Sequence, residues 1–302
     1  MGWQERFIRA RRNRQQSEAQ LALQQLILEG DGGVTTYGTG GGTGGTGGVP
    51  AFDQYSMHFE NGILADVVTT DDPNFAITGS LTISVWAKDT GPILAGSSNY
   101  RGCLDRMTGS STTTKGYFLG LSGRGGAGNQ SWEFILGTDE SASGGSNQRR
   151  FVDVLATSGV WTHICGVWDA ATNIQQIWVN GVTGPSNTLG AGTLIRLPSA
   201  ATDLYLGNMT TSTTSDWDGF LDELSLFNSA FSYPQILELY NAGKPADLSL
   251  HSGAASGVGW WRMGEGANWN GTDWEIPNAF NPGSGDGLSS NMLQTDRVAD
   301  VP

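Results

Sequence analysis

The chain has 302 residues, of which 45 are glycine and only 15% are charged, and its formal net charge is −13. A composition rich in Gly, Thr, Ser, Asn and Trp is typical of short strands joined by tight turns, so we expect one large β-domain with few helices. The acidic body argues against a nucleic-acid partner, because a phosphate-binding groove needs clustered Lys and Arg with stacking aromatics. Neutral sugars, cations or proteins are the expected partners.

Targeting signals are also missing from the expected places. No stretch approaches the ~20 apolar residues that a membrane-spanning helix needs. Residues 1–16, MGWQERFIRARRNRQQ, lack the apolar segment of a signal peptide. We therefore expect no membrane span and no ordinary secretion. Cys103 and Cys165 neither require nor exclude a disulfide, and free thiols are favoured.

Residues 1–30 are expected to form a helical anchor. This segment holds five Arg and three Glu, a net charge of +2, which leaves −15 for the rest of the chain. Its apolar residues recur at the spacing of one helix face, which indicates an amphipathic helix: Ala19, Ala22, Leu23, Leu26 and Ile27. Phe7 and Ile8 add apolar side chains near the start, among Arg9, Arg11, Arg12 and Arg14.

Residues 31–50 are expected to form a glycine-rich linker, because GTGGGTGGTGG at 38–48 combines backbone freedom with an absence of apolar side chains. A helix before a linker and a domain after it indicate an anchor, a tether and a head. The helix could pack on its own body, but docking on another protein or on sister subunits is favoured. The arginines could contact packaged nucleic acid, although a solvated or protein-paired face explains them equally well.

Residues 51–250 are predicted to form an all-β domain, a two-sheet antiparallel β-sandwich of jelly-roll type. Nine runs alternate β-branched or aromatic residues with other residues and are mostly bounded by turn formers. They lie at 55–61, 80–88, 116–123, 132–138, 150–156, 160–169, 174–182, 203–209 and 220–228. Ile83, Val85 and Ala87 are expected to face the core, since successive strand side chains alternate between faces.

One short helix is predicted after the last core strands. In FSYPQILELYNAG, Ser232 is an N-cap, Gln235 has capping-box spacing and Gly243 can end the helix. The helix is expected to lie over a sheet edge. Residues 251–302 form a Trp-rich, loop-rich extension, and its tryptophans should pack on the sandwich or on a partner, because leaving them in water is costly.

Three segments carry a family resemblance: VWTHICGVWDAATNIQQIWVNGV at 160–182, DLYLGN at 203–208 and DGFLDELSLFNSAFSYPQILELYNAG at 218–243. In this order they resemble the laminin-G-like and pentraxin branch of the concanavalin A-like lectin/glucanase superfamily. The resemblance extends from about Phe52 to Gly243 and implies a lectin-like sandwich. The family's motif positions are filled by Trp161, His163, Asp169, Asn180, Gly181, Gly207, Gly219, Asp222 and Glu223.

Two further comparisons refine this resemblance. Cys165 matches a half-cystine position of the pentraxins, but the partner position holds Ser84, so the family's disulfide should be absent. GWWRMGEG at 259–266 and NMLQTDRVADVP at 291–302 resemble the C-terminal sequence of laminin-G-like proteins encoded by marine phages. With the missing signal peptide and the tethered helix, this favours a virion protein assembled in the host cytoplasm.

Catalysis is not expected. Asp216, Asp218, Asp222 and Glu223 are the acidic cluster worth testing against the carboxylate pair of a glycosidase. Adjacent residues of a strand face opposite ways, so Asp222 should be buried and Glu223 exposed, which excludes an acid/base pair on one face. Among the histidines, His163 is interpreted as structural, and no nucleophile elbow, Cys-x-x-Cys pair or phosphate loop occurs.

Calcium is the cofactor that the resemblance allows, since pentraxin-like relatives bind it in the loop before the Gly-x-x-Asp-Glu strand. Here that loop is NMTTSTTSDWDG, and Asn208, Asp216 and Asp218 could supply oxygen ligands. Met-Thr-Thr-Ser replaces the acidic residues that begin the family's loop, so a surface loop without metal is favoured. The same loss puts phosphocholine-type recognition in doubt.

The sequence thus predicts a non-catalytic phage virion protein for capsid decoration, a head fibre or a tail fibre. The N-terminal helix would bind other virion proteins, the chain would form a homo-oligomer such as a trimer, and the sandwich could bind a cell-surface glycan. Alternatives are a carbohydrate-active enzyme, a secreted calcium-dependent lectin and a purely structural cement protein. No residue can be nominated for glycan contact.

Overall fold

The computed structural model of the chain describes residues 52–62, 64–69, 72–94, 96–109, 113–124, 128–139, 148–199, 202–209 and 215–302. The chain divides into two compact units between Val49 and Pro50, and the described residues all belong to the second. The predicted anchor, with Phe7, Ile8, Leu23, Leu26 and Ile27, and the linker at 31–50 lie outside the described residues. No helix in the described part is long and apolar enough to cross a membrane.

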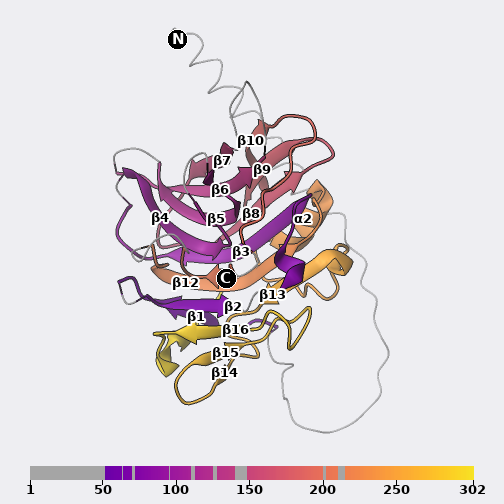
Figure 1. The fold of residues 1–302 in the computed structure, drawn as a ribbon. Helices are drawn as coiled ribbons and strands as arrows, with labels where there is room; N and C mark the ends of the chain where they lie inside the picture. Colours follow the sequence, from indigo (N-terminus) through magenta and orange to yellow (C-terminus); the bar gives the residue numbers. More distant parts are fainter. Residues whose placement is uncertain are drawn as a thin grey trace, which may run out of the picture. The chain divides into compact units, whose positions relative to one another are not determined.

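The second unit is a sandwich of two antiparallel sheets, as the sequence predicts (Figure 1). Within the described residues the first sheet has eight strands, in the order β10-β9-β8-β3-β12-β1-β17, with β13 also paired to β12. Their bounds are β1 Ser56–Phe59, β3 Leu81–Asp89, β8 Thr162–Asp169, β9 Ile174–Val179, β10 Val182–Thr188, β12 Gly219–Phe227, β13 Gly257–Trp261 and β17 Arg297–Val298.

The described part of the second sheet has nine strands, in the order β14-β15-β16-β2-β11-β4-β5-β6-β7. They are β2 Asp66–Thr69, β4 Gly96–Asp105, β5 Gly116–Gly123, β6 Ser131–Thr138, β7 Gln148–Leu155, β11 Leu204–Leu206, β14 Asn268–Trp269, β15 Trp274–Ile276 and β16 Gly287–Ser290. Short 3-10 turns are η1 Pro73–Phe75, η4 Ala254–Ser256 and η5 Gln294–Asp296. The C-terminal residues therefore supply strands to both sheets.

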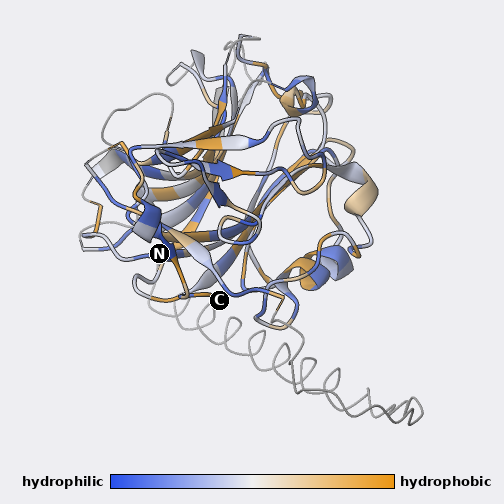
Figure 2. Cartoon of the chain, turned by 90° about the horizontal axis from the view of Figure 1, so that it is seen from below, coloured by the Kyte–Doolittle hydropathy of each residue, from blue (hydrophilic) through white to orange (hydrophobic). Residues whose placement is uncertain are grey.

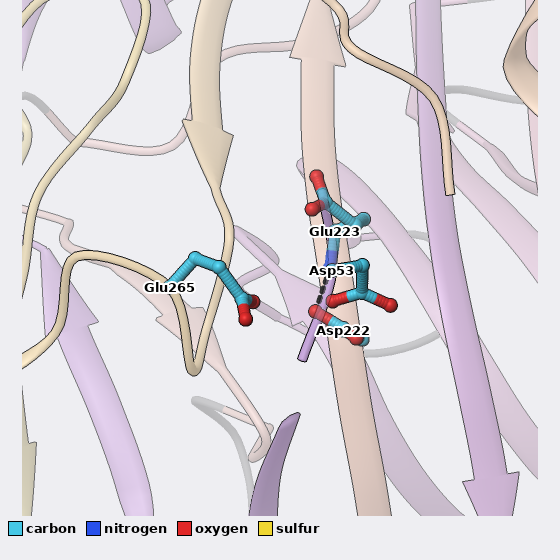
Figure 3. A group of neighbouring side chains, drawn as sticks. All are labelled: Asp53, Asp222, Glu223 and Glu265. Carbon is cyan, nitrogen blue, oxygen red and sulfur yellow. Dashed lines mark hydrogen bonds between the residues drawn. The ribbon is translucent and has the colours of Figure 1, made fainter. Parts of the chain in front are cut away.

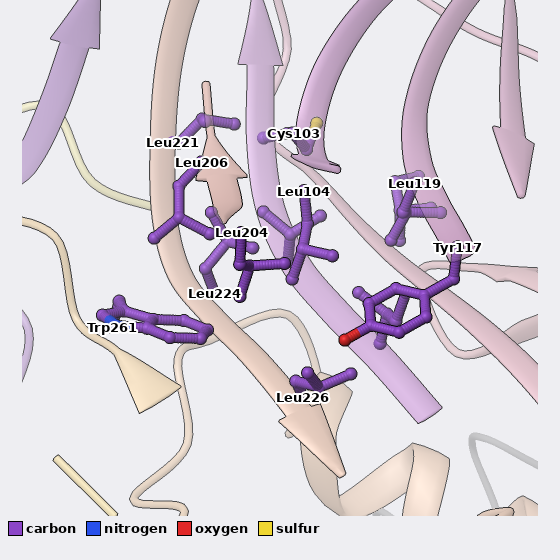
Figure 4. Packing of buried hydrophobic residues seen from close by; sticks show 14 of the residues in the cluster. Cys103, Leu104, Tyr117, Leu119, Leu204, Leu206, Leu221, Leu224, Leu226 and Trp261 are labelled. Atoms are coloured by element: carbon purple, nitrogen blue, oxygen red, sulfur yellow. The ribbon is translucent and has the colours of Figure 1, made fainter. Parts of the chain in front are cut away.

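The main core lies between the sheets. Ile83, Val85 and Ala87 of β3 belong to it, which confirms the predicted alternation. Figure 4 shows leucines of β12 facing leucines of β4, β5 and β11 across the sandwich, with Trp261 beside them. Figure 2 shows hydrophobic and hydrophilic residues alternating along the strands. Alternation along each strand thus lets every strand give one row of side chains to this core.

Helix α2, Tyr233–Tyr240, covers a second apolar cluster on the outer face of the first sheet. Ile236 and Leu239 pack there with Cys165 and Val167 of β8 and with Phe227 of β12. The helix thus lies over the face of the sheet, and the prediction that it lies over an edge is wrong. Its amphipathic stripe needs an apolar surface, and the face of the sheet supplies one.

The ends of α2 agree only in part with the sequence prediction. The side chain of Gln235 accepts a hydrogen bond from the backbone N–H of Ser232 (3.0 Å), which is the predicted N-terminal cap interaction. The C-cap is Asn241, whose φ of 45° is left-handed, so the helix ends before Gly243. Asparagine tolerates this conformation almost as well as glycine.

The nine predicted runs correspond to β1, β3, β5, β6, β7, β8, β9, β11 and β12. Sequence patterns missed β2, β4, β10 and the short strands β13–β17 of the extension that was predicted to be loop-rich. The sequences of β4 and β10, GSSNYRGCLD and VTGPSNT, are rich in turn-forming residues. Trp260, Trp261 and Trp274 are buried, as expected for the extension. Cys103 and Cys165 are free and buried, and Ser84 lies directly opposite Cys165 in the pairing of β3 with β8. The expected absence of the pentraxin disulfide is therefore confirmed.

We predict that Leu224→Ala lowers the free energy of unfolding by about 2–5 kcal/mol, because Leu224 is fully buried and the truncation leaves a cavity between the sheets. Urea denaturation measures the change. Leu250→Ala is the matched control, since Leu250 is 83% exposed and its truncation should change stability by less than about 0.5 kcal/mol. Equal losses in both variants would contradict the described core.

Candidate functional site

A β-bulge in the central strand β12 creates a carboxylate cluster. The pairing of β12 with β3 shifts register between Asp222 and Ser225, and Glu223 has a left-handed φ of 46°. Leu221 and Leu224 both belong to the core, so Asp222 and Glu223 lie together on the outer side of the sheet. The prediction that these two acids face opposite ways is therefore wrong. Glu223 is buried, with 4% of its surface exposed, where exposure was expected.

The bulge lies where three strands meet. One edge of β12 pairs with β1 at Gly219–Leu221 and with β13 at 224–227, so the bulge falls between the two partners. Asp53 precedes β1 and Glu265 follows β13, and both reach this gap. Figure 3 shows the four carboxylates gathered there. One oxygen from each of Asp53, Asp222, Glu223 and Glu265 lies within 4.8 Å of the others.

Neighbouring groups hold two of these acids from outside the cluster. The indole N–H of Trp260 and the Nε of Arg262 (2.9 Å) both donate to the carboxylate of Glu223. Glu265 Oε1 accepts from the backbone N–H groups of Gln54 (2.7 Å) and Tyr55 (2.8 Å). The cluster therefore joins the start of the sandwich, its central strand and its C-terminal extension.

Several carboxylate oxygens in the cluster receive no donor. Asp222 Oδ1 accepts from the backbone N–H of Glu223 (2.8 Å), but no N–H or hydroxyl among the described residues donates to Asp222 Oδ2. The same holds for both oxygens of Asp53 and for Glu265 Oε2. Buried oxygens without donors are costly, so these groups need shared protons or a cation.

Burial and mutual repulsion raise the pKa values of these acids. Burial raises the pKa of Asp53 to about 7, and the charges of Glu265 and Glu223 add to the effect. Burial also raises the pKa of Glu223 to about 7, although Arg262 and Trp260 oppose it. The pKa of Asp222 is raised well above its ordinary value by burial and by the neighbouring carboxylates. Ionising all four acids together is therefore unfavourable without a counter-charge.

The chemistry of this cluster differs from that of a glycosidase. A glycosidase places two carboxyl groups on either side of a bound sugar, about 5–10 Å apart. Here Asp222 is fully buried and Glu223 nearly so, and one oxygen of each of the four groups lies within 4.8 Å of the others. An all-oxygen ligand set of this kind suits hard cations such as calcium.

The residues predicted for calcium occupy two neighbourhoods. Asp216 Oδ2 accepts from the backbone N–H groups of Gly62 (3.1 Å) and Leu64 (2.9 Å), and Asn208 Nδ2 donates to Asp66 (3.2 Å). Burial raises the pKa of Asp66 to about 6, and the charge of Asp216 contributes.

Asp218 instead lies beside a buried ion pair. Its carboxylate is 3.7 Å from Arg101 Nη2, while Arg101 Nη1 donates to Asp89 at 2.7 Å. Asp218 thus shares a cationic partner with Asp89, whereas Asp216 accepts hydrogen bonds from backbone N–H groups.

His163 has a structural environment, as predicted. It is buried between Trp86 and Tyr240, with Nε2 at 2.8 Å from the hydroxyl of Ser84. Burial lowers its pKa to about 3. The ring is therefore neutral at physiological pH.

The remaining motif residues support turns and strand ends. Asn180 and Gly181 both have positive φ in the turn from β9 to β10, and Asn180 Oδ1 accepts from the backbone N–H of His163 (2.8 Å). Trp161 donates to Asp300 (2.8 Å), and Asp169 caps the turn after β8. Gly207 and Gly219 have positive φ values. A Cβ at Gly207 would lie 2.2 Å from the ring of Phe59.

A second candidate site lies on the outer face of the second sheet, which we call the Arg124 patch (Arg124, Glu133, Phe151 and Asp153). Arg124 follows β5; its Nε lies 3.1 Å from Glu133 Oε1 and its guanidinium lies 4.2 Å over the ring of Phe151. Glu133 is in register with Asp153 on β7. Arg124, Phe151 and Asp153 are partly exposed. Glu133 is fully buried, and the partly exposed guanidinium and carboxylate of Arg124 and Asp153 could bind the hydroxyls of a sugar.

Sequence reasoning named neither Asp53 nor Glu265 nor Arg124 as a site residue. Asp53 and Glu265 meet only because β1 and β13 pair with the same edge of β12, a long-range pairing without a local signal. The strongest sequence signal for this cluster was the segment GWWRMGEG, in which Trp260 and Arg262 alternate with apolar residues just before Glu265.

Comparison with known proteins gives one family match and several similar structures. Residues 61–237 match the family model of the concanavalin A-like lectin/glucanases superfamily. Pentraxin-related protein PTX3 of Bos taurus is 40% identical over 38 residues, which are 13% of this chain and 10% of that protein.

Two solved structures resemble the chain at low sequence identity. A candidate carbohydrate-binding protein of Bacteroides ovatus has a TM-score of 0.50 and 14% identity, with 81% of this chain and 60% of that one covered. A heptameric SAP-like pentraxin of Limulus polyphemus has a TM-score of 0.44 and 13% identity, with 82% and 100% covered. This chain thus spans 60% of the length of the Bacteroides protein, and that likeness concerns the fold.

We predict that Arg262→Ala destabilises the sandwich by about 2–4 kcal/mol at pH 8, because it leaves the buried, ionised Glu223 without its cation. This loss of stability is smaller than the loss expected for a fully buried ion pair, because the side chain of Arg262 is 20% exposed. Urea denaturation measures the loss. The double variant Arg262→Ala/Glu223→Gln should lose less than the sum of the single variants, and strict additivity would contradict the coupling.

We predict that His163 makes stability depend on pH below its ordinary pKa. In the unfolded chain the imidazole takes up a proton near pH 6.5, whereas the folded pKa is about 3. The stability advantage of the wild type over His163→Gln should therefore shrink as pH falls from 6 to 4, by at most about 1.4 kcal/mol per pH unit. Urea denaturation across this range tests it, and an unchanging difference would contradict a neutral buried ring.

Proposed function

This chain belongs to the concanavalin A-like lectin/glucanase superfamily, and we propose that it is a non-catalytic adhesion protein of a bacteriophage particle whose sandwich binds glycans. The observation that carries the glycan proposal is the Arg124 patch. There a guanidinium stacked on Phe151 pairs with the buried carboxylate of Glu133 and interacts electrostatically with Asp153. Because its charged groups are already paired with one another, the patch can bind sugar hydroxyls without leaving a charge unpaired.

The proposal that the protein is not an enzyme is supported by the state of its acids. The carboxylates that the bulge brings together are buried, share neighbours and have raised pKa values. A glycosidase is the alternative from another class, and it would need an accessible acid pair across a bound sugar.

The virion part of the proposal is supported by sequence alone. The arginine-rich segment at 1–30 and the glycine-rich segment at 31–50 suit an anchor and a tether, and the C-terminal segment resembles phage-encoded relatives. Several tethered copies on one particle would bind glycans with a higher overall affinity than a single copy, because their weak contacts act together. Electron microscopy of intact particles that carry a labelled copy of this subunit tests this part of the proposal.

We predict that the labelled full chain binds a subset of bacterial surface glycans on an array and that Arg124→Ala weakens this binding at least about tenfold. The reason is that the substitution removes both the stacked cation and its hydrogen-bond donors. Arg297→Ala is the matched control, because Arg297 lies 4.0 Å over the ring of Tyr55 but belongs to the first sheet.

Three outcomes would contradict parts of the proposal. Equal binding by Arg124→Ala would exclude the patch as the glycan site. Absence of any bound glycan would favour a cement protein that contacts only neighbouring subunits. Cleavage of a bound glycan, lost in Glu223→Gln or Asp218→Asn, would favour the glycosidase.

A further inference from the structure

We propose that the carboxylates of Asp53, Asp222, Glu223 and Glu265 bind one calcium ion, which fastens the start of the sandwich to its central strand and its C-terminal extension. This site differs in residues from the loop of Asn208, Asp216 and Asp218 that the sequence suggested. It is independent of the glycan proposal, because it lies on the first sheet whereas the Arg124 patch lies on the second.

The spacing of the oxygens fits a single calcium ion. Calcium binds oxygen ligands at about 2.3–2.6 Å, so two ligands of one ion are at most about 5.2 Å apart. One oxygen from each of the four carboxylates lies within 4.8 Å of the others. The four oxygens are therefore close enough to share one ion after small shifts of their side chains.

The strongest support for a bound cation comes from Asp222. This side chain is fully buried, and its Oδ2 has no hydrogen-bond donor among the described residues. Its other oxygen is bound to the backbone of Glu223, and Figure 3 shows the carboxylate directed toward Asp53. A buried acceptor without a donor is expensive to keep, and a cation would satisfy it directly.

The local charge also favours a cation. Arg262 is the cation that contacts this cluster among the described side chains, and it is occupied by Glu223 and by the carbonyl of Phe52 (2.6 Å). Four carboxylates against one guanidinium leave a large excess of negative charge. A divalent ion offsets most of that excess.

The ligand types select calcium over other metals. Magnesium demands near-ideal octahedral geometry and keeps several waters, which a buried four-carboxylate group with fixed spacing does not favour. Zinc and copper sites prefer histidine or cysteine ligands, and neither residue type belongs to this cluster.

The position of the site suggests what the ion does. Arg262 stacks on Phe52 at 4.0 Å, and Glu265 binds the backbone of Gln54 and Tyr55. These residues directly follow the predicted linker at 31–50. A calcium ion held by Asp53 would therefore fix the point at which the tether enters the head.

Calorimetric titration of the chelator-treated full chain with calcium chloride at pH 7.5 tests the proposal. We expect one ion per chain and a rise in Tm of about 5 °C or more at calcium 100-fold above its Kd. Terbium is a second probe, because an ion at this site would be sensitised by Trp260, whose indole contacts Glu223.

Matched variants locate the ion. Asp53→Asn and Glu265→Gln should each weaken calcium binding at least tenfold and reduce terbium emission, while circular dichroism confirms that they fold. Glu60→Gln removes an exposed carboxylate near the same strand and should change nothing.

Two outcomes would overturn the proposal. The first is an absence of saturable calcium binding by the unmodified chain. The second is unchanged affinity in the folded Asp53→Asn and Glu265→Gln variants with loss of binding in Asp216→Asn, which would place the ion in the loop before β12.

Discussion

The bulge at Asp222 and Glu223 is the constraint on which the architecture of this sandwich depends. One extra residue in β12 turns two adjacent acids to the same side while Leu221 and Leu224 both stay in the core. The bulge also divides one edge of β12 between two partners, β1 and β13. The first and last parts of the sandwich also meet where β1 pairs with β17 and where β2 pairs with β16, but at the bulge the groups that meet are carboxylates.

Much of the sandwich could be predicted from local pattern, and the reasons are visible in particular residues. Ile83, Val85 and Ala87 alternate cleanly because β3 lies in the middle of a sheet with a core on one side. Strand β4 gave no such signal, since its glycines and serines resemble a turn and its pairing with β5 is irregular. Strands with regular alternation could therefore be predicted from the sequence. Strands with irregular sequences were recognised only in the structure.

The candidate site was harder to predict because strand alternation fails at a bulge. A period of two places Asp222 and Glu223 on opposite faces, and only the left-handed φ of Glu223 reverses this result. Asp53 and Glu265 are separated from the bulge by long stretches of sequence, so their proximity depends on strand order. The sequence could therefore name the Asp-Glu pair but not the group to which it belongs.

The two candidate sites lie on opposite outer faces of the sandwich. The carboxylate cluster lies on the outer side of the first sheet, next to the residues that follow the linker. The Arg124 patch lies on the outer face of the second sheet, beyond the core. The two sites share no residue and the core lies between their sheets, so a change at one need not alter the other.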